Sequence, residues 1–182
     1  LTDTTPSINS GEKIMFKGNL MPQLYSGIGK FNANKKFAIS GNIMSLNFND
    51  FQNVTDISSN ALIFSTLFAG CTTLVSAENL ILPATTLVEG CYYYMFGGCT
   101  SLLTAPELPA TTLASQCYFA MFNGCTSLVN TPELPATTLA DNCYGSMFNH
   151  CTSLVNAPEL PSTTLANNCY SSMFGNCTSL TT

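Results

Sequence analysis

Apolar and polar residues recur in register every 26 positions through the C-terminal half of the chain. Three complete units read CTSLLTAPELPATTLASQCYFAMFNG from Cys99, CTSLVNTPELPATTLADNCYGSMFNH from Cys125 and CTSLVNAPELPSTTLANNCYSSMFGN from Cys151. A looser unit starts at Cys71, and a partial unit starts at Cys177. A repeat of this length is typical of solenoids, in which stacked units bury a common core. The pattern therefore predicts a repeat solenoid and favours recognition of a partner over catalysis.

Each unit divides into two halves of different character. The first half, C-T-S-L-V-N-A-P-E-L-P, is leucine-rich and bounded by prolines without an N–H, which favours a brief strand or extended segment. In the second half, apolar residues recur every four positions, as in Leu139, Cys143, Met147 and Cys151. This spacing predicts one or two helical turns with a single apolar stripe, and Asp141 is placed to cap them.

A pair of small or polar residues closes each unit. These pairs are Gly97-Gly98, Asn123-Gly124, Asn149-His150 and Gly175-Asn176. Glycine and asparagine tolerate positive φ, so the pairs predict a tight turn. The only histidine, His150, falls in this column, and we interpret it as a turn residue because histidine is also enriched at positive φ.

Stacking the units aligns equivalent side chains into apolar columns. The predicted core columns are Leu102, Leu128, Leu154 and Leu180; Leu108, Leu134 and Leu160; Leu87, Leu113, Leu139 and Leu165; Met95, Met121, Met147 and Met173; and Phe96, Phe122, Phe148 and Phe174. Each fully buried side chain of this kind contributes roughly 1.5–3 kcal/mol, so several columns per coil can offset the entropy lost on ordering a coil.

Charged residues are few, at 8% of the chain, and unevenly distributed. All five lysines lie before residue 37, and there is no arginine. Residues 37–182 carry eight of the ten acidic residues and no cation. Nucleic-acid binding requires a basic face, so that function is excluded for the repeat array. The array must be stabilised by burial and backbone hydrogen bonds rather than by salt bridges.

Eight of the nine cysteines form two columns, and Cys71 extends the second. The columns are Cys91, Cys117, Cys143 and Cys169, and Cys99, Cys125, Cys151 and Cys177. Ile63 stands where the first column would continue, which indicates that the position requires an apolar residue. We therefore interpret the cysteines as buried free thiols. Disulfides between coils remain the alternative. A metal site is not predicted, because the C-x₇-C spacing lacks close cysteine pairs or a histidine column.

Two further columns are candidates for ligand binding. The tyrosine column, Tyr92, Tyr118, Tyr144 and Tyr170, could stack sugars or anchor a protein partner if exposed. The alternative is that the rings cover the edge of the core and pack on one another. The glutamate column, Glu107, Glu133 and Glu159, would form an acidic ladder, either a solvated face or a calcium site. No catalytic motif is recognisable, so neither an enzyme nor a cofactor is predicted.

The N-terminal third does not match the repeat. We assign residues 1–48 to an N-terminal linker and a β-rich capping segment, because apolar and polar positions alternate around two Gly-Asn turns, Gly18-Asn19 and Gly41-Asn42. Residues 49–182 form the predicted solenoid. It begins with a degenerate coil at 49–70 and continues with coils from 71, 99, 125 and 151 and a partial coil from 177.

The F-x-x-C-T-S-L core of the unit, present as MFNGCTSL at residues 121–128, resembles the BspA-like leucine-rich repeats of surface proteins from Bacteroides-type bacteria. The segment SGNIMSLNF at residues 40–48 is also similar to that group. The units here are longer than the common form and carry E-L-P-A-T-T-L where it has I-P-x-x-V. The resemblance implies an α/β repeat solenoid: a leucine-rich-repeat-like right-handed coil with short strands, short helical turns and an N-terminal cap.

The same resemblance implies a lipoprotein or secreted protein on the extracellular face of the outer membrane, attached to the membrane only through a lipid anchor outside this segment. Two functions follow as hypotheses. The first is a non-catalytic adhesin or binding module for a host or bacterial surface protein or glycan. The second is a structural or accessory subunit of a larger outer-membrane complex, such as a glycan-uptake system.

Overall fold

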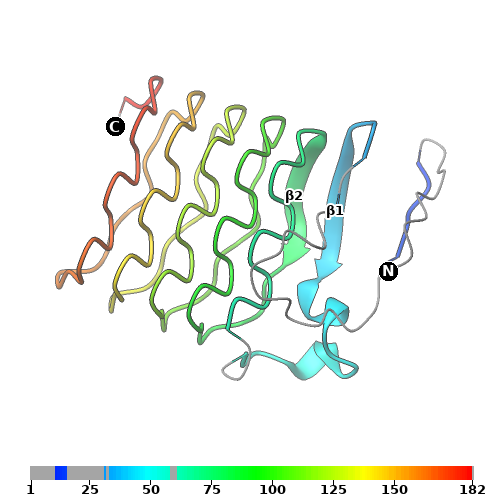
Figure 1. Cartoon of the computed structure of the whole chain (residues 1–182), viewed down its shortest axis with the longest axis horizontal. Coiled ribbons are helices and arrows are strands. Elements are labelled where there is room, and N and C mark those ends of the chain that lie inside the picture. The colour runs from blue at the N-terminus through cyan, green and yellow to red at the C-terminus, as the bar shows by residue number, and fades with distance from the viewer. Residues whose placement is uncertain (1–10, 16–30, 32, 58–60, 182) are drawn as a thin grey trace.

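The computed structural model describes residues 11–15, 31, 33–57 and 61–181. Its regular elements are strand β1 (Phe37–Asn42), the 3₁₀ helices η1 (Ile43–Leu46) and η2 (Phe51–Asn53), and strand β2 (Leu74–Ile81). β1 pairs with β2 in parallel. From β2 onward the chain winds through successive coils that lie side by side (Figure 1). The predicted repeat architecture is confirmed, whereas the handedness of the coil stays a prediction.

Hydrogen bonds between coils run through the second half of each unit. Every second backbone N–H donates to a carbonyl of the following coil, as from Tyr92 to Cys117 at 3.0 Å and from Phe96 to Met121 at 2.9 Å. The intervening N–H groups donate within their own coil, as from Met95 to Tyr92 at 3.3 Å. Because the two sets alternate, the backbone is satisfied both within a coil and between coils.

The predicted helical turns are wrong, because the described residues contain no α-helix. The second half of each unit is instead a run of tight turns in which every fourth residue has positive φ, as in Asn142 (55°), Ser146 (54°) and His150 (61°). Such a residue breaks an α-helix and lets alternate N–H groups face the neighbouring coil. The four-residue spacing of apolar side chains is real, but a turn ladder produces it.

Asp141 does not cap a helix as predicted. Its carboxylate oxygens accept hydrogen bonds from the backbone N–H of Asn167 at 3.0 Å and from the side-chain Nδ2 of Asn167 at 3.2 Å. Asn167 is the equivalent residue of the next coil, so this contact joins two coils at their surface.

The predicted turn column is confirmed. Positive φ occurs at Gly98 (75°), Gly124 (73°), His150 (61°) and Asn176 (59°). The interpretation of His150 as a turn residue therefore holds.

A strand forms in the first half of only one unit. β2 extends over eight residues in the coil from Cys71, which has no proline before Pro83. The three later units contain a pair of prolines in this half, where the described residues show one isolated parallel bridge, between Ser76 and Thr104. The longer series of bridges, which links Asp56, Thr86, Thr112, Thr138 and Thr164, lies after the prolines, in the second half of the units. Proline lacks the N–H that a ladder needs, so the predicted strands are reduced to extended segments in these units.

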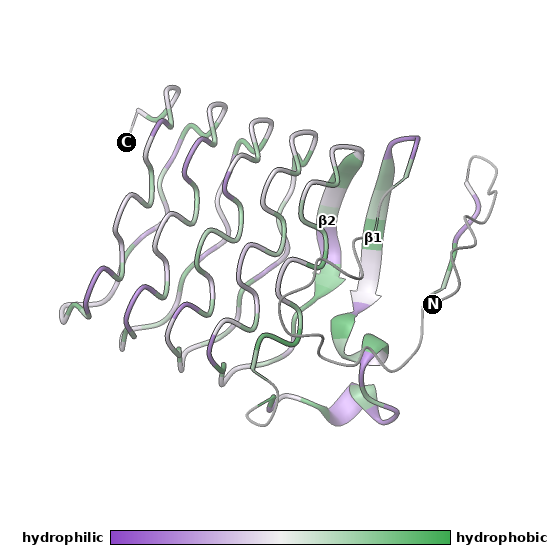
Figure 2. Ribbon diagram, viewed as in Figure 1, coloured by the Kyte–Doolittle hydropathy of each residue, from purple (hydrophilic) through white to green (hydrophobic). Residues whose placement is uncertain are grey.

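The predicted core columns are largely confirmed. The leucines at 102, 128 and 154, the methionines from 95 to 173, and the phenylalanines at 96, 122 and 148 are buried. Figure 2 shows each coil alternating between hydrophobic and hydrophilic stretches. Exposure increases toward the last coil: Leu134 is 3% exposed and Leu160 in the same column 40%, and Leu87 is 4% exposed and Leu165 in its column 68%. The prediction that Leu160 and Leu165 belong to the core is therefore wrong. Each coil is covered by the one that follows, and the residues after Cys177 supply only the start of another unit.

β1 lies beside the first described coil. Phe37 pairs in register with Leu74, and the ring of Phe31 lies 5.3 Å from the ring of Phe68. Gly41 has a positive φ of 99° at the end of β1, whereas the predicted Gly18-Asn19 turn lies outside the described residues, as does most of the predicted capping segment. The boundary between that segment and the solenoid stays a prediction. No helix in the described part of the chain has the length and hydrophobicity needed to cross a membrane.

Candidate ligand-binding surface

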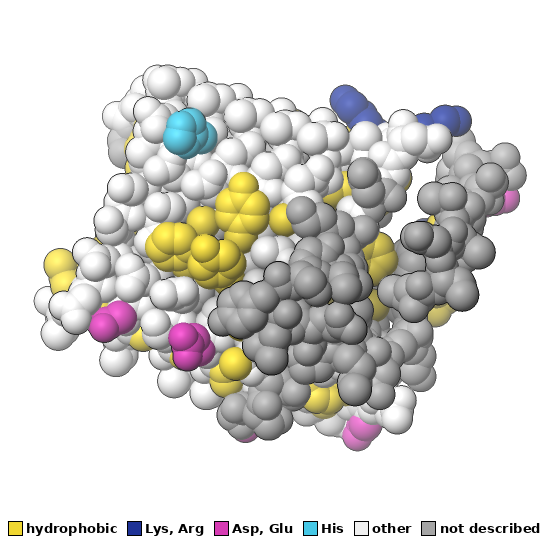
Figure 3. All heavy atoms as spheres, viewed as in Figure 1, with side chains coloured by type: hydrophobic (Ala, Val, Ile, Leu, Met, Phe, Trp, Pro, Cys, Tyr) yellow, Lys and Arg dark blue, Asp and Glu magenta, His cyan; other side chains and the backbone are white. Residues whose placement is uncertain are grey.

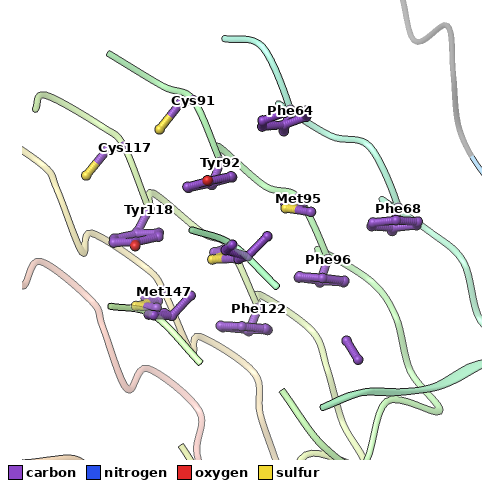
Figure 4. Close-up of a cluster of buried hydrophobic side chains, with 14 of the residues drawn as sticks. Phe64, Phe68, Cys91, Tyr92, Met95, Phe96, Cys117, Tyr118, Phe122 and Met147 are labelled. Atoms are coloured by element: carbon purple, nitrogen blue, oxygen red, sulfur yellow. The ribbon is translucent and has the colours of Figure 1, made fainter. Parts of the chain in front are cut away.

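The tyrosine column lies inside the protein. Tyr92, Tyr118 and Tyr144 are at most 1% exposed. The rings of Tyr92 and Tyr118 stack at 5.7 Å between centroids (Figure 4), and those of Tyr118 and Tyr144 stack at 5.8 Å. Tyr170 continues the stack and is half-buried. Tyr92, Tyr118 and Tyr144 are therefore not exposed to solvent, as they would have to be to bind a ligand. The alternative, in which the rings pack on one another, describes the structure.

The hydroxyl groups of the three buried tyrosines have no hydrogen-bond partner among the described residues. Burial raises the pKa of Tyr118 well above its usual range, so the phenol is neutral at physiological pH. Phe64 occupies the equivalent position one coil earlier and stacks on Tyr92 at 5.9 Å (Figure 4). The position therefore requires an aromatic ring, and the hydroxyl adds no contact.

The cysteines are free, and all but Cys177 are buried. In one column each thiol donates to a carbonyl of the preceding coil, as from Cys99 to Phe68 at 3.1 Å and from Cys125 to Phe96 at 3.2 Å. Burial raises the pKa of Cys99 to about 12, so it stays a neutral thiol at physiological pH. The described residues contain no group of three or more His, Cys, Asp or Glu side chains suited to hold a metal.

We expect the buried thiols to resist alkylation in the native chain. With iodoacetamide at mildly alkaline pH, half-buried Cys177 should react first and Cys125 should stay unmodified, because the reactive thiolate is suppressed by burial. Mass spectrometry of peptic peptides, taken at intervals, measures both positions. All cysteines should react in denaturant, which serves as the control. Equal labelling of Cys125 and Cys177 in the native chain would contradict this packing.

The glutamate column is exposed as predicted and lines a shallow depression across the coils. One groove, of about 540 Å³, includes Glu78, Glu107 and Glu133 in its lining, and a second, of about 380 Å³, includes Glu133 and Glu159. The grooves share residues 131–133 and Pro135, so they form one depression that we call the trough. Its lining consists of Glu78, residues 103–109, residues 130–135, Pro158, Glu159 and Pro161.

The paired prolines account for the trough. Residues 105–110 and 131–136 form no backbone hydrogen bond with each other, although they are adjacent segments of neighbouring coils. Pro106 and Pro132 occupy equivalent positions in the two segments and lack the N–H that would close the gap. The coils therefore remain joined through their turn ladder while a depression persists between their first halves.

An exposed apolar column borders the trough. Leu103, Val129 and Val155 are 53%, 39% and 37% exposed. The N–H of Val155 donates to the carbonyl of Val129 at 3.2 Å, so these two members of the column are fixed relative to each other. Leu103 also lines the trough. This column was not predicted from the sequence, because an apolar residue next to the buried Leu102 is expected to belong to the core.

Carboxylates in the trough have no cation nearby in the repeat array. Residues 37–182 contain no lysine or arginine, and the lysines that the structure describes, Lys13, Lys35 and Lys36, are exposed. On the face in Figure 3, lysine side chains gather at the N-terminal end of the array. The four glutamates of the trough therefore present an unneutralised negative surface.

The turn half carries a smaller aromatic patch. Tyr93, Tyr94 and Phe119 are half-buried, and the rings of Tyr93 and Phe119 stack at 5.3 Å. Hydrophobic side chains also gather on the face shown in Figure 3. A Cβ on Gly97 would lie 2.3 Å from the ring of Tyr94, so this glycine is needed for the ring to lie flat. The patch spans two coils only, because Gly145 and Ser171 replace the aromatic residue in later units.

Comparison with known proteins gives one structural likeness. No protein-family model and no curated protein matches the chain. The crystal structure of the T. pallidum leucine-rich repeat protein TpLRR is similar, with 20% sequence identity and a TM-score of 0.38. The likeness covers 64% of this chain and 48% of that protein, so the chain matches about half of its length.

Proposed function

We propose that this chain is a non-catalytic recognition module of a bacterial cell surface that binds a protein partner through the trough and its apolar border. The observation that carries the proposal is the exposure of Leu103, Val129 and Val155 over consecutive coils beside unpaired carboxylates. Contiguous apolar patches on soluble proteins commonly mark interaction sites. The resemblance of the unit to BspA-like repeats supports the surface location.

A repeat array suits this function because its surface is extended and regular. The turn ladder fixes each coil against the next, so side chains of the trough are held in place before a partner arrives. A preorganised surface loses less conformational entropy on binding than a flexible one. The tyrosines, in contrast, contribute through the core and not through direct contact.

Affinity isolation from solubilised outer membranes tests the proposal. We expect a partner to be recovered with the wild-type chain and largely lost with the Leu103→Asn/Val129→Asn variant, because the apolar border would be replaced by polar groups. The control is Ser171→Asn/Ser172→Asn, which changes exposed residues on the turn half. Equal recovery with all three chains would contradict binding through the trough.

The identity of the recovered protein separates the two surface roles. Stable recovery of other membrane subunits would favour the accessory-subunit alternative, since a permanent neighbour would then cover the apolar border. Recovery of a host or foreign bacterial protein would favour an adhesin.

A further inference from the structure

We infer that the trough docks a basic amphipathic α-helix of the partner protein. This inference rests on the proposed function and adds the chemistry and secondary structure of the bound segment. Two features of the trough support it: its charge and its apolar border.

Charge selects a basic occupant. Each coil from Cys71 onward places one glutamate in the trough, giving Glu78, Glu107, Glu133 and Glu159. The array has no cation of its own to neutralise them. Carboxylates held at coil spacing repel one another, and a partner with one positive charge per coil relieves that repulsion.

The apolar border selects an amphipathic helix. Leu103 lines the trough and heads the exposed column that continues with Val129 and Val155. A helix whose basic stripe faces the carboxylates can place an adjacent apolar stripe on this column. Addition of a strand is not favoured at the same place, because Pro106 and Pro132 remove N–H donors from the segments that line the trough.

The test measures binding of two synthetic peptides of identical composition to the full chain. The first is a helical peptide of about 18 residues, roughly five turns, built from alanine, lysine and leucine with one lysine per turn on one face and leucines on the adjacent face. The second contains the same residues with the lysines distributed around all faces. Equal net charge removes non-specific attraction to an acidic protein as an explanation.

Two protein variants of equal charge locate the site. Glu107→Gln/Glu133→Gln removes two carboxylates from the trough, and Glu89→Gln/Asp50→Asn removes two exposed carboxylates outside it. We expect the first peptide to bind the wild-type chain about tenfold more tightly than the second, and the trough variant to lose about tenfold in affinity. The control variant should stay within about twofold, and melting curves should show that both variants are folded.

Three results would overturn the inference. If the two peptides bind with equal affinity, or if the two variants weaken peptide binding equally, net charge alone would account for the binding. Salt-sensitive self-association of the chain that the trough variant abolishes would assign the trough to a second copy. If partner recovery is lost with Leu103→Asn/Val129→Asn while the peptides fail to discriminate, the recognition function stands and only the basic helix is rejected.

Discussion

Replacing Phe122 by alanine should destabilise the chain by about 3–5 kcal/mol. The ring is fully buried and stacks between Phe96 at 5.5 Å and Phe148 at 5.6 Å, so truncation leaves a cavity in the middle of a column. The neighbouring coils are held by the backbone ladder, so the gap cannot close without breaking hydrogen bonds such as that from Phe122 N–H to Met147 O at 2.9 Å. Denaturant unfolding of the purified chain measures the loss.

The matched control is Glu133→Ala, an exposed position in the trough. Its effect on stability should stay within about 0.5 kcal/mol, because no packing or backbone bond depends on that side chain. Similar midpoints for the two variants would mean that the phenylalanine column does not form the core in solution.

Replacing Tyr118 by phenylalanine should raise stability by about 1–2 kcal/mol. The hydroxyl is buried without a partner in the described structure, and Phe64 already occupies the equivalent place at the start of the column. Removing the oxygen keeps the stacked ring and eliminates the cost of burying an unsatisfied polar group. The midpoint of denaturant unfolding should rise with little change in slope.

Tyr170→Phe is the control from the same column. Tyr170 is half-buried, so its hydroxyl is not forced out of water and the change should be close to neutral. A loss of stability in Tyr118→Phe would show that the hydroxyl is satisfied in solution, for instance by an internal water, and would overturn the interpretation of the column as purely apolar.

The repeat, its turn pairs and most of the core could be predicted, because identical residues at a fixed period report directly which side chains stack. The conformation of the second half could not, since a four-residue apolar spacing suits both a helix and a turn ladder. The signal for turns was spread over residues of different types, such as Tyr94, Ala120 and Ser146, which all have positive φ. Only the closing column, rich in glycine and asparagine, revealed that backbone state.

The candidate surface was predicted in part for a similar reason. Glutamate at a repeated position is readily identified as exposed, and the glutamate column proved so. Tyrosine is common both in the core and on the surface. Phe64, at the equivalent position one coil earlier, was the one indication in the sequence that the tyrosine column is internal. The trough could not be predicted, because it depends on which backbone bonds the prolines remove between two coils.

Hydrogen–deuterium exchange of the chain, measured with and without its recovered partner, tests the central claim most directly. If the trough binds the partner, exchange should slow in peptides covering residues 103–109 and 129–135 and stay unchanged in the turn half at residues 115–124. Protection confined to residues 115–124, where the aromatic Phe119 lies, would contradict binding through the trough and assign recognition to the opposite half of the coils.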